Sequence, residues 1–195
     1  GLEKIVGTTT RISKIISGLR VFSRDSSKDP MANFLISKVV EETIELCKER
    51  FKNYDIDVVI NGDRTIPMYG RATQVSQVLL NLLNNAFDAV VNLEERWIEI
   101  NYFIQDNQVK VEVIDSGFGI PNEVSEKMLQ PFFTTKEVGK GTGLGLSISK
   151  GIIEDHGGKF YYQQKLNHTC FGIELPRVVE SHFVKPQEGH RDLSV

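Results

Sequence analysis

Four glycines alternate with other residues in segment 138–150 and lead directly into an apolar run. They are Gly139, Gly141, Gly143 and Gly145. Glycine adopts positive φ angles and lets another molecule approach the backbone closely. A helix that starts after such a loop presents free N–H groups and a positive dipole end, which together bind phosphate. The spacing fits neither the Walker A motif nor the three-glycine dinucleotide motif, so a flexible surface loop is the alternative for this segment taken alone.

Asparagines cluster within a long predicted helix, residues 71–92. Asn81, Asn84 and Asn85 fall inside three turns, although asparagine is a mediocre helix former. Mg²⁺ keeps most of its octahedral shell as water and phosphate oxygens, so the neutral amide oxygen of Asn85 is a sufficient protein ligand. Asn81, one turn earlier, would orient a proton-bearing nucleophile or a metal-bound water. A solvated helix face is the alternative.

A carboxylate and two glycines follow a predicted strand in Asp115-Ser-Gly-Phe-Gly119. Asp115 can accept a hydrogen bond from the exocyclic amine of a base, while Gly117 and Gly119 let the backbone approach the ring. The alternative is that Asp115 only forms a turn.

An aromatic pair and a lysine mark a third segment, Pro131-Phe-Phe-Thr-Thr-Lys136. Phe132 and Phe133 are expected to be core residues that anchor a mobile segment. Lys136 and Lys140 flank the glycine-rich loop, where an ammonium is a suitable point charge for phosphate.

Strands and helices alternate along residues 33–175, with antiparallel hairpins among them. This order predicts an α/β (α+β) two-layer sandwich, a mixed sheet with helices on one face. Turns are expected at Asn61-Gly62, between strands 57–60 and 66–69, and at Asp106-Asn107. The other predicted strands are 33–37, 97–105, 109–115, 159–164 and 169–175, and the helices are 38–52, 71–92, 123–129 and 146–155. Core residues expected on the first of these helices are Val39, Val40, Ile44, Leu46 and Cys47.

Residues 2–24 form a predicted amphipathic helix with Ile5, Ile12 and Leu19 at seven-residue intervals. Such a helix must pack against a partner, in a dimeric bundle or, alternatively, on the chain's own domain. The predicted organisation is a helix and hinge in 1–30, a globular domain in 31–177 and a disordered tail in 178–195.

The composition narrows the function classes. A net charge of −3 and a pI near 5.9 predict no nucleic-acid partner. No apolar run approaches the roughly 18 residues that span a bilayer, so no membrane contact by this chain is expected. Cys47 and Cys170 are expected to be buried free thiols, which fits a cytoplasmic location.

Taken together, the motifs resemble one family. Asn81–Ala89, Asp115–Gly119, Phe132-Phe133 and Gly141–Gly145 have the order and spacing of the N, G1, F and G2 boxes. They resemble the catalytic, ATP-binding domain of sensor histidine kinases, within the gyrase, chaperone, histidine kinase and mismatch-repair ATPase superfamily. The resemblance implies a Bergerat ATP-binding fold preceded by one long helix, the second of a dimerisation and phosphotransfer hairpin.

The same resemblance implies ATP and Mg²⁺ as cofactors and assigns the site residues. Asn81, Asn85 and Lys136 would be catalytic, with Asn85 as the metal ligand. The predicted nucleotide contacts are Asn85, Asp88, Asp115, Gly117, Gly119, Ile120, Phe133, Thr135, Lys136, Lys140, Gly141, Thr142, Gly143, Leu144, Gly145, Leu146 and Thr169.

No histidine of the chain has the sequence context of the family's phosphoacceptor. His156 is expected to cap a helix C-terminus, His168 lies in a predicted hairpin, and His182 and His190 lie in the tail. The implied function is transfer of the γ-phosphoryl group of ATP to a histidine outside this chain, on the hairpin of a homodimer, for a response regulator. An ATP-hydrolysing conformational switch and a protein-serine kinase are the alternatives.

Overall fold

The computed structural model describes residues 29–137 and 141–177. The predicted helix 2–24, Gly139, Lys140 and the predicted tail lie outside these ranges. The elements are β1 (Ala32–Leu35), α2 (Ile36–Asn53), β2 (Asp57–Gly62), β3 (Pro67–Gly70), α3 (Ala72–Val90), β4 (Trp97–Gln105), β5 (Gln108–Asp115), α4 (Asn122–Ser125), α5 (Gly145–Asp155), β6 (Lys159–Lys165) and β7 (His168–Pro176).

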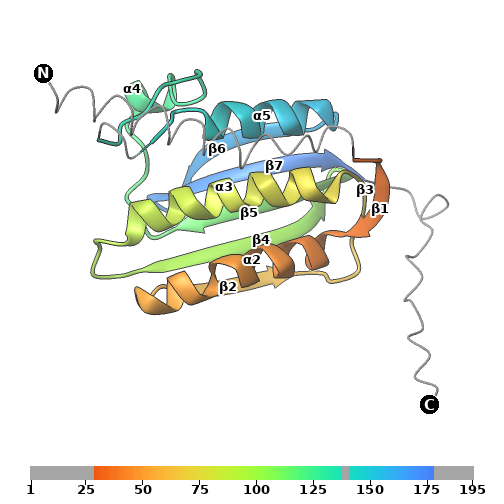
Figure 1. Ribbon diagram of the computed structural model, residues 1–195, viewed down its shortest axis with the longest axis horizontal. Helices are drawn as coiled ribbons and strands as arrows, with labels where there is room; N and C mark the ends of the chain where they lie inside the picture. Colours follow the sequence, from red (N-terminus) through yellow and green to blue (C-terminus); the bar gives the residue numbers. More distant parts are fainter. Residues whose placement is uncertain (1–28, 138–140, 178–195) are drawn as a thin grey trace, which may run out of the picture.

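Five strands form a mixed sheet in the order β2-β4-β5-β7-β6. β2 runs parallel to β4, and the other neighbours are antiparallel. Strands β1 and β3 pair separately as a two-stranded sheet. Helices α2, α3 and α5 lie on one face of the large sheet (Figure 1). The predicted two-layer sandwich is confirmed.

The β4–β5 hairpin follows from its sequence. Ile98, Ile100 and Tyr102 alternate with less buried residues and face the helices. Asp106 and Asn107 both have positive φ, 51° and 59°, which is the backbone geometry of a two-residue hairpin turn. The predicted turn is therefore confirmed.

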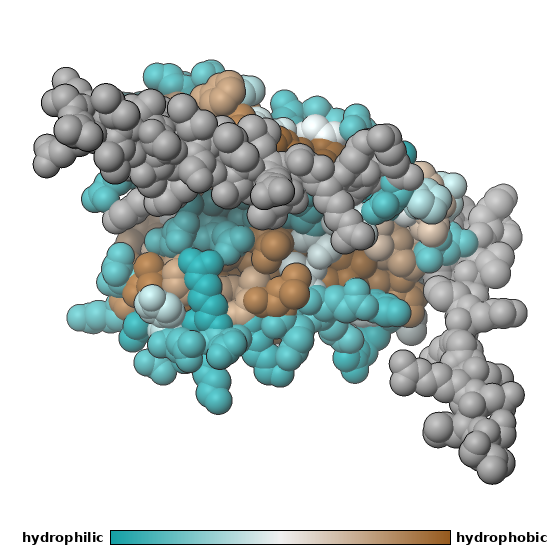
Figure 2. Space-filling view, in the orientation of Figure 1, coloured by the Kyte–Doolittle hydropathy of each residue, from teal (hydrophilic) through white to brown (hydrophobic). Residues whose placement is uncertain are grey.

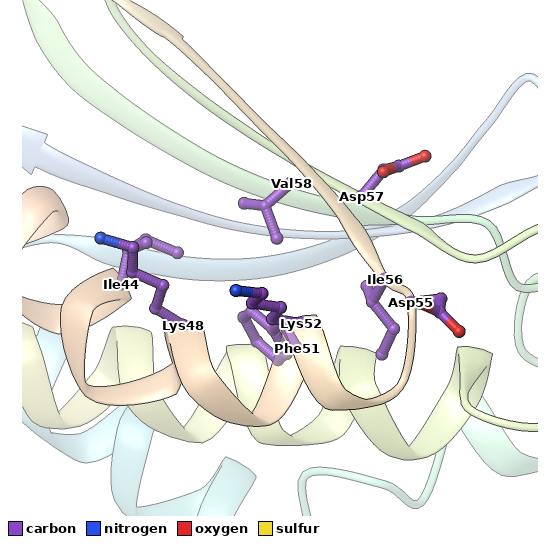
Figure 3. Close-up of a pocket in the computed structure, with 8 residues that line it drawn as sticks. All are labelled: Ile44, Lys48, Phe51, Lys52, Asp55, Ile56, Asp57 and Val58. Atoms are coloured by element: carbon purple, nitrogen blue, oxygen red, sulfur yellow. The ribbon is translucent and has the colours of Figure 1, made fainter.

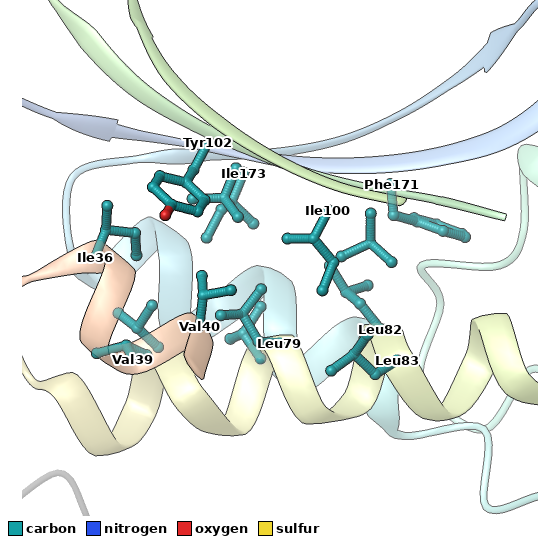
Figure 4. Packing of buried hydrophobic residues seen from close by; sticks show 14 of the residues in the cluster. Ile36, Val39, Val40, Leu79, Leu82, Leu83, Ile100, Tyr102, Phe171 and Ile173 are labelled. Atoms are coloured by element: carbon teal, nitrogen blue, oxygen red, sulfur yellow. The ribbon is translucent and has the colours of Figure 1, made fainter. Parts of the chain in front are cut away.

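The core lies between the sheet and the helices (Figure 4). Leu79, Leu82 and Leu83 of α3 point toward Ile100 and Ile173 of the sheet. The predicted stripe of α3 is buried throughout: Val75, Val78, Leu79, Leu82, Leu83, Ala86 and Val90. Helical periodicity thus identified the packed face of this helix.

Leu46 of α2 is not a core residue. Its side chain is 72% exposed, whereas Val40, Thr43 and Cys47 are buried. At about 100° per residue, Leu46 points roughly 100° away from the centre of the stripe through these residues. The prediction for Leu46 was wrong.

Asn61 and Gly62 do not form a turn. Both continue β2, whose residues pair with β4 as far as Gly62 opposite Tyr102. A Cβ at position 62 would collide with the Tyr102 ring, so the glycine allows the two residues to approach closely. The chain reverses after β2, around Asp63, whose side chain accepts hydrogen bonds from Thr65.

The described surface of the helix-bearing side carries hydrophilic side chains with apolar patches between them (Figure 2). Within residues 29–137 and 141–177, no helix combines the length and apolarity that a membrane crossing requires. Cys47 and Cys170 are buried and unbonded to each other, as predicted.

Candidate nucleotide-binding site

One end of the candidate site lies where the last residues of β5 pair with the first residues of β7. Asp115, the last residue of β5, lies opposite Thr169 on β7. The Asp115 carboxylate is 3% exposed and accepts hydrogen bonds from the Gly117 N–H, at 2.9 Å, and from the Thr169 side chain. A Cβ at position 117 would lie 2.6 Å from Asp115 Oδ1, so glycine is needed for this contact. Three predicted site residues are thus held together.

Burial controls the protonation of Asp115. Loss of hydration raises its pKa from the ordinary 3.8 to about 6, against the lowering effects of the Gly117 and Thr169 hydrogen bonds and the His168 charge. At neutral pH the group is therefore a carboxylate and a hydrogen-bond acceptor. It is the buried charged group at this end of the described site.

Helix α3 connects this end to a second polar cluster. Asn81, Asn85 and Ala89 follow one another at four-residue intervals, so they lie on one side of the helix over about 12 Å. Gly117 is close to this row, because a Cβ at position 117 would lie 3.6 Å from Ala89 Cβ. The two asparagines therefore extend away from Asp115 along a single helix.

The start of α5 packs against the first asparagine. Asn81 Nδ2 donates to Ser149 Oγ at 3.0 Å, and any Cβ at Gly145 would collide with Asn81 Oδ1. α5 begins at Gly145 with no side-chain cap, so its first N–H groups are available to an acceptor in front of the helix. An anion there would meet amides and the positive end of the helix dipole.

Lys136 brings a cation to the second asparagine. Its Nζ lies 2.5 Å from Asp88 Oδ2 and 3.2 Å from Asn85 Oδ1. The predicted lysine, amide and carboxylate therefore meet at one point of α3.

The segment before the glycine-rich loop packs against its far end. Phe132 N–H donates to Gly143 O at 2.9 Å, and a Cβ at Gly143, whose φ is +68°, would collide with the Phe132 backbone. Phe133 packs against the core as expected. Phe132 does not: its side chain is 71% exposed and its φ is +68°. The paired backbone turns it outward, so the core prediction for Phe132 was wrong.

The remaining predicted contacts are distributed around these two clusters. Ile120 N–H donates to Tyr162 Oη at 2.9 Å, and Leu144 N–H to Thr142 Oγ1 at 3.3 Å. Gly119, with φ +86°, lies against Gln164. Leu146 packs on the core, and a Cβ at Gly141 would lie 2.8 Å from Thr134 Oγ1. Thr135 is exposed between Thr134 and Lys136.

Sequence reasoning missed several residues that hold this site. Ser149, Tyr162 and Gln164 contact predicted residues from α5 and β6, and Arg50 contacts Asp88 from α2. Arg50, Tyr162 and Gln164 lie outside every motif, whereas Ser149 lies within segment 138–150. Of these four residues, Ser149 had a positional signal, because it lies on the predicted helix 146–155, four residues after Gly145.

The two described histidines have structural partners. His156 is the C-cap of α5, and Gly157 follows with φ +69°, as predicted. Its Nε2 accepts the Arg71 N–H at 3.1 Å, so Nδ1 carries the proton and donates to Ile152 O at 2.7 Å. His168 packs edge-on against Trp97, with ring centroids 4.8 Å apart.

A groove of about 480 Å³ lies elsewhere, between α2 and β2. Ile44, Phe51, Ile56 and Val58 form its apolar wall, with Lys48 and Lys52 beside them (Figure 3). None of the predicted site residues lines it. It is separate from the candidate site.

Comparison with known proteins gives consistent matches. Residues 70–179 match the family described as histidine kinase-, DNA gyrase B-, and HSP90-like ATPase. The sensor kinase CckA of Brucella abortus is 36% identical, over 92% of this chain and 20% of its own length. The chain therefore spans about a fifth of that relative.

Solved structures agree. The nucleotide-free catalytic domain of histidine kinase ThkA is 36% identical with a TM-score of 0.69, over 76% of this chain and 96% of that one. ThkA in complex with response regulator protein TrrA is 30% identical with a TM-score of 0.69, over 89% of this chain and 49% of that one. The chain belongs to the histidine kinase-, DNA gyrase B- and HSP90-like ATPase family and carries the catalytic, ATP-binding domain of a sensor histidine kinase.

Proposed function

We propose that this domain transfers the γ-phosphoryl group of ATP to a histidine that is not among those of this chain and that lies on a helical hairpin. An imidazole nitrogen of that histidine forms the new bond to the γ-phosphorus. The bond from this phosphorus to the bridging oxygen breaks, and ADP leaves. Catalysis of such a transfer depends on positioning and charge stabilisation rather than on covalent chemistry by the protein.

The observation that carries the proposal is the row along α3. Asp115 and Gly117 lie at one end of it, next to Ala89, and Asn81 lies at the other, against the first residue of α5. A nucleotide laid along this row would present its base to a buried carboxylate. Its phosphates would meet Lys136 and the N–H groups of α5.

The residues present fit Mg²⁺. Asn85 Oδ1 is a hard oxygen ligand of the kind that this ion prefers, and it already contacts a cation, Lys136 Nζ. Among the described residues there is no group of three or more acidic, histidine or cysteine side chains that would enclose a metal. This suits an ion that keeps water and phosphate oxygens as its other ligands. Bound beside Asn85, it would neutralise charge on the phosphates.

Hydrolysis is the weaker candidate. An ATPase needs a general base for the attacking water, and Asn81, the side chain next to the α5 N-terminus, is an amide that cannot accept the proton. This favours a nucleophile supplied by another part of the protein. A protein-serine kinase remains the other alternative, which the chemistry of the product distinguishes.

We further propose that the hairpin belongs to a homodimer and that the phosphoryl group passes to a response regulator. Support comes from ThkA, a relative captured with response regulator protein TrrA. The buried, unpaired thiols of Cys47 and Cys170 support the predicted cytoplasmic location.

The test is labelling with [γ-³²P]ATP. The chain alone should show negligible self-labelling, and a longer version that includes the whole hairpin should become labelled at histidine. Phosphohistidine is lost in acid and stable in base, whereas phosphoserine is stable in acid. Asn85→Ala should abolish labelling. Acid-stable label on the longer protein, or rapid labelling of His156 or His168 in the short one, would contradict the proposal.

A further inference from the structure

Arg50, on α2, approaches the site from outside the family motifs. Its guanidinium carbon lies 3.5 Å from the centroid of the Phe87 ring. Its Nη1 donates to Asn84 Oδ1 at 2.8 Å, and its Nη2 lies 3.6 Å from Asp88 Oδ1. The ring and the amide hold Arg50 in place independently of the carboxylate.

Asp88 is therefore shared between two cations from different elements. Arg50 faces Oδ1, and Lys136 Nζ lies 2.5 Å from Oδ2. Lys136 also reaches Asn85 Oδ1, at 3.2 Å. While Lys136 occupies this position, its charge is directed toward Asp88 and Asn85.

Binding of a triphosphate would change the partners of Lys136. A divalent cation on Asn85 Oδ1 would repel the ammonium that now contacts the same oxygen, and phosphate oxygens would attract it. Asp88 would then lose one of its two cations. Arg50 stays, because its contacts with Phe87 and Asn84 do not involve Lys136.

We infer that Arg50 is a positioning residue for ATP that acts through Asp88. By pairing with Asp88 it weakens the hold of that carboxylate on Lys136 and keeps Asp88 neutralised after Lys136 turns to the phosphates. Arginine suits this role because it stays charged and can stack and pair at once. The inference rests on the proposed function of the site and adds a residue from another helix.

The test compares Arg50→Met, Asp88→Asn and the double variant by titration with Mg-ATP and with AMP. Arg50 and Asp88 are 44% and 41% exposed, so removal of one partner should change affinity by about two- to fivefold. Arg50→Met should lower the affinity for ATP by this factor and leave the affinity for AMP unchanged, since AMP lacks the β and γ phosphates. Asp88→Asn should raise the affinity for ATP.

The double variant shows whether Arg50 acts through Asp88 or whether its positive charge attracts the phosphates directly. If Arg50 acts through Asp88, Arg50→Met has no further effect once Asp88 is Asn. An equal loss in both backgrounds, or a loss that extends to AMP, would overturn the inference. Arg64→Met is the matched control, because Arg64 pairs with Glu41, which lies on α2 like Arg50 but away from the site.

Arg50→Lys covers the case in which Arg50→Met perturbs packing on Phe87. It keeps the charge on α2 and should restore most of the ATP affinity. If Arg50→Lys binds ATP as weakly as Arg50→Met, the inference fails. If the unaltered protein does not bind ATP, the proposed function fails instead, so the two failures are distinguishable.

Discussion

Asp115→Asn should stabilise the protein at neutral pH while it damages the site. Ionised Asp115 is buried, and its raised pKa means that the folded state holds the proton more tightly than the unfolded state. When folding raises the pKa of a carboxyl group, its contribution to stability is fully present below the pKa of the unfolded state. This contribution is lost as the pH rises through the pKa of the folded state. Asparagine has no charge to desolvate, so this loss disappears.

The size of the effect follows from the shift. A rise from 3.8 to about 6 is roughly two pKa units, which corresponds to about 3 kcal/mol of destabilisation at pH well above 6. At pH 5 the same shift gives roughly half of this, and at pH 7.5 nearly all of it, about 3 kcal/mol. The advantage of Asp115→Asn over the unaltered protein should therefore grow by about 1 kcal/mol between these two pH values.

Urea unfolding of both proteins at pH 5 and pH 7.5 measures this difference. Asp57→Asn, a change at an exposed aspartate of β2, controls for the loss of one carboxylate. If the free energy of unfolding of Asp115→Asn instead fell relative to that of the unaltered protein as the pH rises, ionisation of buried Asp115 would not destabilise the fold, and the account would be refuted. A pH-independent difference would refute it equally.

Further changes test the glycine-rich segment. Gly145→Ala should destabilise the protein by about 1–3 kcal/mol and weaken ATP binding, because the new methyl group collides with Asn81 Oδ1; calorimetry and urea unfolding measure both effects. Gly151→Ala on the same helix should be neutral or stabilise by about 0.5–1 kcal/mol, since its Cβ meets nothing within 4 Å. Equal losses from the two changes would show that contact with Asn81 is unimportant. Hydrogen exchange of segment 136–143 should slow on addition of Mg-ATP, as expected of a segment that closes over a ligand; full protection without nucleotide would contradict this.

Local patterns predicted most of the domain because its helices and strands bury regular faces. The α3 stripe and the β4–β5 hairpin each depend on a period or a turn within one stretch of chain. Asn61-Gly62 shows where this fails. The dipeptide is a strong local turn signal, but parallel pairing of β2 with β4 and close contact with Tyr102 override it.

The candidate site divides in the same way. Asn81, Asn85, Asp115 and the glycines could be proposed as site residues because they lie in three short sequence motifs: the asparagines share one, Asp115 lies in the second, and the glycines lie in the second and third. Arg50 could not, because its contacts with Phe87 and Asp88 join residues more than thirty positions apart and leave no periodic signal. Phe132 was misassigned because its positive φ and its pairing with Gly143 depend on the folded loop.

Calorimetric titration with ATP and GTP in the presence of Mg²⁺ tests the central claim most directly. The claim is that the Asp115 carboxylate accepts a hydrogen bond from the amino group of adenine. A hydrogen bond to a charged group contributes about 1.5–3 kcal/mol, so ATP should bind about ten- to a hundredfold more tightly than GTP, which presents a carbonyl oxygen at that position. Asp115→Asn should remove most of this preference. Equal affinity for the two nucleotides, unchanged in Asp115→Asn, would contradict the assignment of the site.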